Sequence, residues 1–293
     1  MNKNLLVTGI DGFIGSNFAL QARINNFKVF GLSRPSANWD AKQYEKNLKD
    51  ISQNNEFESV IHFGAIASTR LIDKEALYGF NVEAVKIITN FCSSTNTPLV
   101  FISSSAIYGN ASNNLSLYAE TKKHGESIIH NSPNLRFLIL RLFNTYGFNE
   151  IAKNDMKSLI SDMIISGLKN KKISIWEFSD LQLGSQSRDF VYVQDVISII
   201  ITLISSKRFF HETLDLGSGE SYKFIDIANY IASIESNLLI ELVSPPTTYE
   251  KKFYQQYTCA NISWMKKVDD LRLPRHPFEI IPELIKRYEL LIK

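Results

Sequence analysis

The stretch Thr8-Gly9-Ile10-Asp11-Gly12-Phe13-Ile14-Gly15 carries three glycines, each three residues after the one before. It follows a short apolar run, Leu5 to Val7, that is typical of a buried parallel strand, and the residues from Phe13 to Arg23 then indicate a helix. The glycines suit a tight turn, a close approach of a diphosphate to the backbone, and close packing of the helix on the strand. Free amides at the helix start would face the phosphates. A glycine turn can be purely structural, but its place between strand and helix favours a dinucleotide site formed by Gly9, Gly12, Phe13, Ile14 and Gly15.

The end of the next predicted strand, Lys28 to Leu32, bears on which dinucleotide is expected. A site that prefers NAD usually places an acid there to bind the ribose 2′-hydroxyl. Here the residues are Ser33 and Arg34, and an arginine can pair with a 2′-phosphate. We therefore expect NADP, with NAD as the alternative if Arg34 is a solvated loop residue.

Apolar runs and helical patterns alternate through the first half of the chain. Strands are predicted at 59–65, 99–102 and 135–142, and residues 81–93 have apolar side chains at helical spacing. This alternation predicts an α/β fold, a doubly wound parallel sheet with helices on both faces. The pattern changes after about residue 147, so we expect a first domain at 1–147 and a smaller α/β domain mainly at 148–293, with elements of the two interleaved.

The stretch Tyr118-Ala119-Glu120-Thr121-Lys122 places a tyrosine and a lysine four residues apart, which on a helix puts them on one face. An ammonium near a phenol favours the phenolate, so this tyrosine could exchange a proton near neutral pH. The serines Ser103 to Ser105 end the strand at 99–102, where open α/β sheets bind ligands. A Tyr–Lys pair is common on surface helices, so a functional interpretation of this pair depends on the other motifs.

Composition limits the classes of partner. A hydrophobic share of 44% and a charged share of 21% are those of a globular protein, and a net charge of +2 indicates neither a nucleic-acid nor an anionic-membrane partner. We expect a cytoplasmic protein, because no apolar stretch suits a signal peptide or a membrane span, and Cys92 and Cys259 fit reduced thiols. No metal is expected, since the five histidines lack ligand spacing. His62 lies in an apolar run and is interpreted as a core residue.

Five motifs, taken in order, resemble those of the extended short-chain dehydrogenase/reductases that act on nucleotide-activated sugars. They are the glycine stretch, Ser104 before Ala106-Ile107-Tyr108-Gly109, Tyr118 with Lys122, Arg141-Leu142-Phe143-Asn144 with Tyr146-Gly147, and Arg188-Asp189-Phe190 with Tyr192-Val193 and Asp195. The resemblance implies a Rossmann-type dinucleotide-binding domain, a smaller substrate-binding domain, a nucleotide-diphosphate sugar as substrate, and a homo-oligomer.

The resemblance also implies roles for single residues. Tyr118 would take a sugar hydroxyl proton, Lys122 would lower the tyrosine pKa and bind the nicotinamide ribose, and Ser104 would donate a hydrogen bond to the sugar oxygen. Arg188 would clamp the diphosphate, or it would instead pair with Asp189 or Asp195. Further contacts are implied to the cofactor for Phe63, Gly64, Ala65 and Asn81, and to the substrate for Ser68, Asn144 and Tyr257.

Residues 146–156 and 254–261 resemble the heptose 6-epimerase branch of this family. That branch has a second catalytic base at the position of Lys153, which would otherwise be an exposed lysine at a helix start. The resemblance thus predicts an epimerase that oxidises a sugar carbon transiently with tightly held NADP. An NADPH-dependent ketosugar reductase is the alternative, and a non-catalytic NADP-binding protein is a weaker one. Ser105 and Ala106 stand where dehydratases of the family have an Asp-Glu pair, which argues against elimination.

Overall fold

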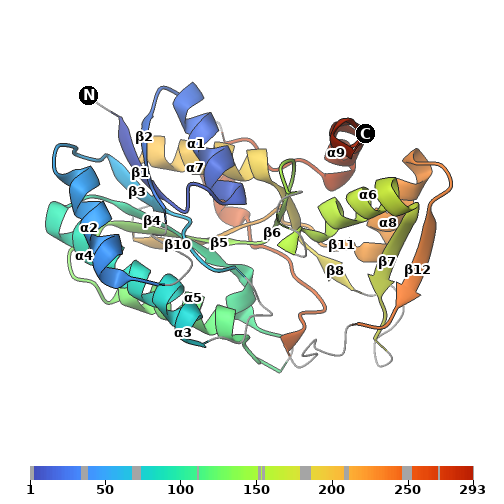
Figure 1. The fold of residues 1–293 in the computed structure, drawn as a ribbon, viewed down its shortest axis with the longest axis horizontal. Helices are drawn as coiled ribbons and strands as arrows, with labels where there is room; N and C mark the ends of the chain where they lie inside the picture. The colour runs from blue at the N-terminus through green and yellow to red at the C-terminus, as the bar shows by residue number, and fades with distance from the viewer. Residues whose placement is uncertain are drawn as a thin grey trace. The chain divides into compact units, whose positions relative to one another are not determined.

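The glycine stretch joins the first strand to the first helix in the computed structural model (Figure 1). The structure describes residues 3–33, 39–67, 74–110, 112–150, 153, 156–178, 186–207, 211–245, 253–269 and 271–292. The chain divides into two units, each built from two segments. Unit 1 comprises Met1–Leu142 and Ile197–Leu214, and unit 2 comprises Phe143–Val196 and Asp215–Lys293. The separate roles expected for two domains stay predictions.

Unit 1 is organised around a six-stranded sheet with the order β10-β5-β4-β3-β1-β2. The strands are β1 (Asn4–Thr8), β2 (Lys28–Leu32), β3 (Ser59–His62), β4 (Leu99–Ser104), β5 (Phe137–Leu142) and β10 (Glu212–Leu216). From β2 through β5 every neighbouring pair is parallel. Thr8 lies opposite both Leu32 and His62, so the carboxyl ends of β1, β2 and β3 meet at one edge of the sheet.

Helices cover both faces of this sheet, which confirms the predicted doubly wound α/β class (Figure 1). α1 (Phe13–Ile24) and α7 (Val193–Ser206) lie on one face, and α2 (Ala41–Ser52), α4 (Ala84–Thr95) and α5 (Leu117–His130) lie on the other. α4 is preceded by α3 (Lys74–Tyr78) and a π-helical turn, η1 (Gly79–Glu83). Polar composition hid α2 from the sequence patterns. Only Tyr44 and Leu48 are buried on it, and Asp40 caps it by accepting a bond of 3.0 Å from the Gln43 amide.

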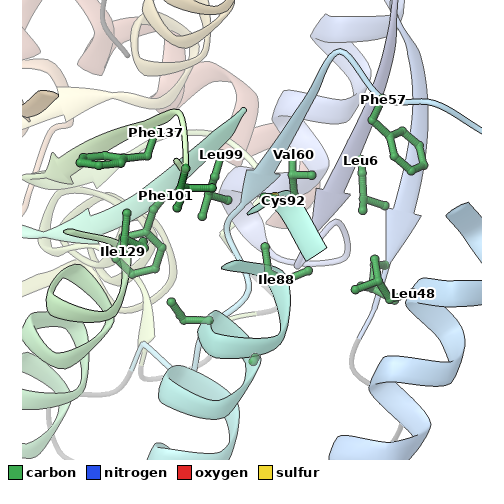
Figure 2. Packing of buried hydrophobic residues seen from close by; sticks show 14 of the residues in the cluster. Leu6, Leu48, Phe57, Val60, Ile88, Cys92, Leu99, Phe101, Ile129 and Phe137 are labelled. Atoms are coloured by element: carbon green, nitrogen blue, oxygen red, sulfur yellow. The ribbon is translucent and has the colours of Figure 1, made fainter. Parts of the chain in front are cut away.

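The core of unit 1 fills the space between the sheet and α2, α4 and α5 (Figure 2). Strand residues such as Leu6, Val60 and Leu99 face helix residues such as Ile88 and Ile129, and all five are fully buried. Burying a side chain of this size contributes about 1.5–3 kcal/mol. This packing holds β4 against α5, and the sheet pairing places β3 and then β1 beside β4.

Unit 2 consists of short strand pairs and three longer helices. β6 (Asn144–Tyr146) pairs with β9 (Phe190–Tyr192), β7 (Lys172–Trp176) with β12 (Leu239–Val243), and β8 (Ser187–Arg188) with β11 (Tyr222–Lys223). The helices are α6 (Leu159–Asn170), α8 (Phe224–Ile234) and α9 (Pro277–Ile292). Within the described ranges, no helix has both the length and the apolar character to cross a membrane.

Candidate active site

The glycine turn is shaped by contacts that exclude side chains. Gly9 has a φ of 64°, and a Cβ on it would come within 2.7 Å of the Gly64 amide nitrogen. A Cβ on Gly15 would lie 2.2 Å from the Gly9 carbonyl oxygen. α1 begins at Phe13 with Gly12 as its N-cap, and in the described residues no side chain caps it and no acid occupies its first turn. The helix N-terminus is therefore suited to an anion such as a diphosphate.

A cavity of about 300 Å³ opens beside this turn. Its lining combines Gly9 and Gly12 of the turn, Ser33 after β2, and the segment Phe63 to Ala65 after β3. These predicted cofactor residues are thus brought together, while Phe13, Ile14 and Gly15 form the start of the adjoining helix. Arg34 and Ser68 lie outside the described residues. Asp11 and Trp39 also line the cavity and were not among the residues predicted for the site.

Asn81 lies in the π-helical turn and is 1% exposed. Its Oδ1 accepts a bond of 2.8 Å from the Ile66 amide, and its Nδ2 donates to the Ile66 carbonyl (3.1 Å) and to Thr121 Oγ1 (3.0 Å). Asn81 therefore ties the loop after β3 to α5. The contact with cofactor expected from the resemblance stays a prediction, and what the structure shows is a brace between the cavity wall and the helix that carries Tyr118.

Ser104, Tyr118 and Lys122 come together at the carboxyl end of β4. Tyr118 and Lys122 are both buried on α5, and the Ser104 side chain neighbours the Tyr118 hydroxyl. The Lys122 ammonium donates to the Ile102 carbonyl at 2.7 Å and lies 4.8 Å from the centre of the Phe101 ring. A tyrosine, a hydroxyl donor and a lysine at the end of a parallel strand form a group that can hold and transfer a proton.

Burial changes the proton affinities expected for this group. The sequence predicted that Lys122 would lower the pKa of Tyr118, but in this structure burial raises that pKa, and the neighbouring Ser104 side chain opposes the rise. Burial also lowers the pKa of Lys122 to about 7, against the attraction of the Glu126 carboxylate. The correction follows from desolvation, which depends on packing and therefore could not be predicted from the four-residue spacing.

Glu126 extends the Tyr118–Lys122 face of α5 by another four residues. Its carboxylate is 5% exposed, and its Oε1 accepts a bond of 2.5 Å from Ser103 Oγ. Arg141 binds the same carboxylate and also donates to the Tyr108 hydroxyl at 3.0 Å. Through Arg141, Glu126 links Lys122 to the segment η2 (Ser105–Tyr108) that follows Ser104. The spacing of this acid, eight residues after the tyrosine, was visible in the sequence.

His62 is a buried residue of β3, as predicted, and it also lines the cavity. Its Nδ1 and Thr8 Oγ1 are hydrogen-bonded at 2.8 Å, whereas its buried Nε2 has no hydrogen-bond partner in the part of the chain that the structure describes. Burial, helped by the charge of Lys122, lowers the pKa of His62 to about 3. His62 is therefore neutral near pH 7 and is not a proton donor there.

Arg188 in unit 2 is almost fully buried against aromatic rings. Its guanidinium carbon lies 5.0 Å from the centre of the Tyr254 ring and 5.5 Å from that of Phe224, and Nη1 donates to the Ser187 carbonyl at 2.9 Å. The two acids named as alternative partners have other bonds. Asp189 accepts from the amides of Ser218, Gly219 and Ala260, and Asp195 is paired with Arg275 at 2.7 Å. A guanidinium that stacks on aromatic rings can still donate from its in-plane N–H groups, which is the way arginine binds a phosphate.

The other predicted substrate residues of unit 2 differ in exposure. Tyr257 is 63% exposed, so its ring is accessible to a ligand. Asn144 instead bridges two segments, because its Nδ2 donates to the Asp189 carbonyl (3.1 Å) and to Thr258 Oγ1 (3.3 Å). Both assignments as substrate contacts stay predictions.

Lys153 is held by a buried acid. Its ammonium donates to Glu150 Oε2 at 2.9 Å, and the Lys153 side chain is 30% exposed while that of Glu150 is fully buried. Glu150 also accepts bonds from the Gly147 amide, from the amide and hydroxyl of Ser158, and from the Ser161 hydroxyl, at 2.7–3.0 Å. Glu150 therefore ties Gly147, Lys153, Ser158 and Ser161 together, and its role was not foreseen from the sequence.

The cavity at the glycine turn, the parallel sheet and the Ser104–Tyr118–Lys122 group define an enzyme of the short-chain dehydrogenase/reductase class. Within this class the chain belongs to the NAD dependent epimerase/dehydratase family, whose model matches residues 5–217.

Comparisons with individual proteins agree with this assignment. The chain is 26% identical to an ADP-L-glycero-D-manno-heptose-6-epimerase of Brachyspira hyodysenteriae over 89% of this chain and 90% of the relative. Its fold is similar to that of the Helicobacter pylori ADP-L-glycero-D-manno-heptose-6-epimerase, with a TM-score of 0.82, 21% identity and coverage of 98% and 96% of the two chains. It is also similar to the UDP-glucuronic acid 4-epimerase of Bacillus cereus in complex with UDP-glucuronic acid and NAD, with a TM-score of 0.76, 20% identity and coverage of 98% and 99%.

Proposed function

We propose that this protein is a nucleotide-sugar epimerase that keeps its nicotinamide cofactor bound through the cycle and acts on an ADP-heptose-type sugar at carbon 6. The observation that carries the proposal is the placement of the Ser104 side chain next to a buried Tyr118 and a buried Lys122, in the same unit as the glycine-turn cavity. The choice of sugar is supported by likeness to the heptose epimerases at 24–26% identity.

The residues present fit a dinucleotide. The open N-terminus of α1 would hold the diphosphate, and the cavity walls after β2 and β3 would enclose the adenosine part. When bound, the nicotinamide would supply a hydride acceptor and donor for the sugar carbon. We propose a nicotinamide dinucleotide here without specifying its 2′-substituent, because Arg34, on which the expectation of NADP rested, lies outside the described residues.

Tyr118 would take the proton from the sugar hydroxyl and later return it. Ser104, whose side chain neighbours the tyrosine, would donate its single O–H to the sugar oxygen, while its oxygen can accept from the neutral Tyr118 hydroxyl. Lys122 has a pKa of about 7. Its charged form would stabilise the Tyr118 phenolate, and its neutral form would not. Acid–base help of this kind typically changes a rate by ~100- to 10,000-fold.

An epimerase must return hydrogen to the opposite face of the sugar, so it needs a proton partner for the second pose. We propose Lys153 for this role, with Glu150 as the acid that holds it. Arg188 would bind the substrate diphosphate with its in-plane N–H groups while its faces stay on Tyr254 and Phe224. Self-association, implied by the resemblance, stays a prediction.

The test uses a panel of ADP-, UDP-, GDP- and dTDP-sugars with the purified protein and Tyr118→Phe. We expect conversion of one sugar to its epimer with no cofactor added, and a loss of at least ~100-fold in rate for Tyr118→Phe. Stoichiometric use of added NADPH would favour the ketosugar reductase instead. Unchanged activity of Tyr118→Phe would rule out this enzymatic mechanism.

A further inference from the structure

The end of β2 carries no acid of its own, but an acid reaches it from the glycine turn. Asp11 Oδ2 accepts a hydrogen bond from the Ser33 hydroxyl. The position follows from the sheet, since Thr8 lies opposite Leu32 and the Gly9 amide donates to the Leu32 carbonyl at 3.2 Å. The residues that follow β1 and β2 are thereby held side by side, and the carboxylate lies where NAD-binding proteins place their ribose-binding acid.

The cavity that Asp11 and Ser33 line has the character of an adenosine site. Trp39, Tyr44 and Phe80 contribute aromatic rings to it, and the Trp39 ring centre lies 5.3 Å from each of the other two. The Trp39 indole also donates a hydrogen bond to Glu83 in the π-helical turn, which fixes the ring. Rigid aromatic faces beside a hydroxyl and a carboxylate suit a purine and its ribose.

The described lining of this cavity contains one acid. Among the described residues that line it, Asp11 is the acid, no lysine or arginine is present, and His62 is neutral because burial lowers its pKa to about 3. A ribose 2′-hydroxyl could donate to this carboxylate. A 2′-phosphate carries up to two negative charges and would be repelled by it.

We infer that Asp11 is the residue that selects the cofactor: its carboxylate accepts from the adenosine ribose 2′-hydroxyl and excludes a 2′-phosphate, so that the chain binds NAD in preference to NADP. Ser33 is a positioning residue in this account, because its hydroxyl holds the carboxylate toward the end of β2. This reverses the expectation drawn from Ser33 and Arg34. The inference concerns the cofactor alone and stands apart from the identity of the sugar.

The experiment measures cofactor binding with no sugar present, so its result is independent of the epimerase assay. Dissociation constants for NAD and NADP are measured by isothermal titration calorimetry for the wild type, Asp11→Asn and the control Glu45→Gln, an exposed acid on α2. We expect the wild type to bind NAD at least ~10-fold more tightly, and Asp11→Asn to narrow that ratio by ~10-fold or more, mainly through tighter binding of NADP. Glu45→Gln should keep the wild-type ratio.

A second readout covers protein that purifies with cofactor already bound. The nucleotide released on denaturation is identified by mass spectrometry, and we expect NAD from the wild type and a larger NADP share from Asp11→Asn. Quenching of tryptophan fluorescence by bound NAD should be weaker in Trp39→Phe, which reports that the adenosine part occupies this cavity. NADP bound as tightly as NAD by the wild type, or an unchanged ratio in a folded Asp11→Asn, would overturn the inference.

Discussion

The carboxylate of Glu126 accepts two hydrogen bonds from the guanidinium of Arg141, at 3.1 Å from Nε and 2.7 Å from Nη2. The acid is almost fully buried and lies four residues after Lys122 on α5, so its charge acts on the lysine as well as on the arginine. The pair therefore joins the end of β5 to the helix that carries Tyr118.

Replacing Glu126 by Gln should destabilise the protein by about 2–4 kcal/mol, because the amide cannot balance the Arg141 charge and leaves buried donors unsatisfied. The free energy of unfolding from urea titrations measures this. The exposed substitution Glu45→Gln, in the same unit, should change it by less than about 0.5 kcal/mol. Equal effects of the two substitutions would show that the buried pair contributes nothing beyond a surface charge.

The buried neutral His62 predicts a dependence of stability on pH. Its pKa is about 3 in the folded chain, against 6.5 for an ordinary histidine, so between these pH values the unfolded state binds the extra proton. Stability should therefore rise with pH from about 3 to about 6.5 and not change further through this group. From pH 7 to pH 5 the loss is about 2 kcal/mol.

Urea titrations at pH 7 and pH 5 on the wild type and His62→Gln check this. The loss of unfolding free energy between the two pH values should be about 2 kcal/mol smaller in His62→Gln than in the wild type. The exposed His124 provides the matched control, since His124→Gln should keep the wild-type difference. A wild-type difference between the two pH values that survives in His62→Gln would assign the titration to another group.

Substitutions in the Glu150–Lys153 pair distinguish a structural role of Glu150 from a catalytic role of Lys153. Glu150→Gln should lower the free energy of unfolding by about 3–5 kcal/mol, because the buried carboxylate balances the charge of Lys153 and accepts four further bonds. Lys153→Met should cost less, since the lysine is partly exposed. Lys153→Met should nevertheless abolish epimerisation in a folded protein, as judged by product analysis. Retained epimerisation would remove Lys153 from the mechanism.

Arg188→Lys tests the assignment of the diphosphate site. Lysine keeps the positive charge but loses the planar group that stacks on Tyr254 and Phe224 and binds phosphate in a bidentate way. We expect the KM for the nucleotide sugar to rise by ~10-fold or more, with a smaller change in kcat. Steady-state kinetics against Lys223→Arg, an exposed residue of β11, provides the comparison. An unchanged KM for Arg188→Lys would place the diphosphate elsewhere.

Local patterns predicted the parts of the fold that local chemistry determines. β2 begins and ends where the sequence pattern placed it, and the glycine turn was predictable because Gly9 and Gly15 have no room for side chains. α2 was missed because a helix needs only a narrow buried stripe, here Tyr44 and Leu48, and the rest of its surface is polar. The strand β10 joins the sheet beside β5 from a distant part of the chain, a pairing that no local pattern contains.

In the candidate site too, features set by local sequence were predictable and features set by packing were not. The Tyr118–Lys122 spacing was visible, but the direction of the Tyr118 pKa shift depends on burial, and burial depends on packing from several elements. No role was predicted for Asp11, because its partner, Ser33, follows a different strand. The structural roles of Glu126 and Glu150 depend on the buried donors that surround them, and these neighbours cannot be recognised from the sequence.

The most direct test of the epimerase proposal runs the reaction in both directions in deuterated water. The protein, with no cofactor added, is incubated separately with an ADP-heptose and with its 6-epimer, and the products are followed by NMR. The account predicts that both reactions reach the same mixture, that carbon 6 keeps its own hydrogen because the hydride is returned, and that Tyr118→Phe stops both. Deuterium at carbon 6, or no conversion of either epimer by protein that holds its cofactor, would contradict it.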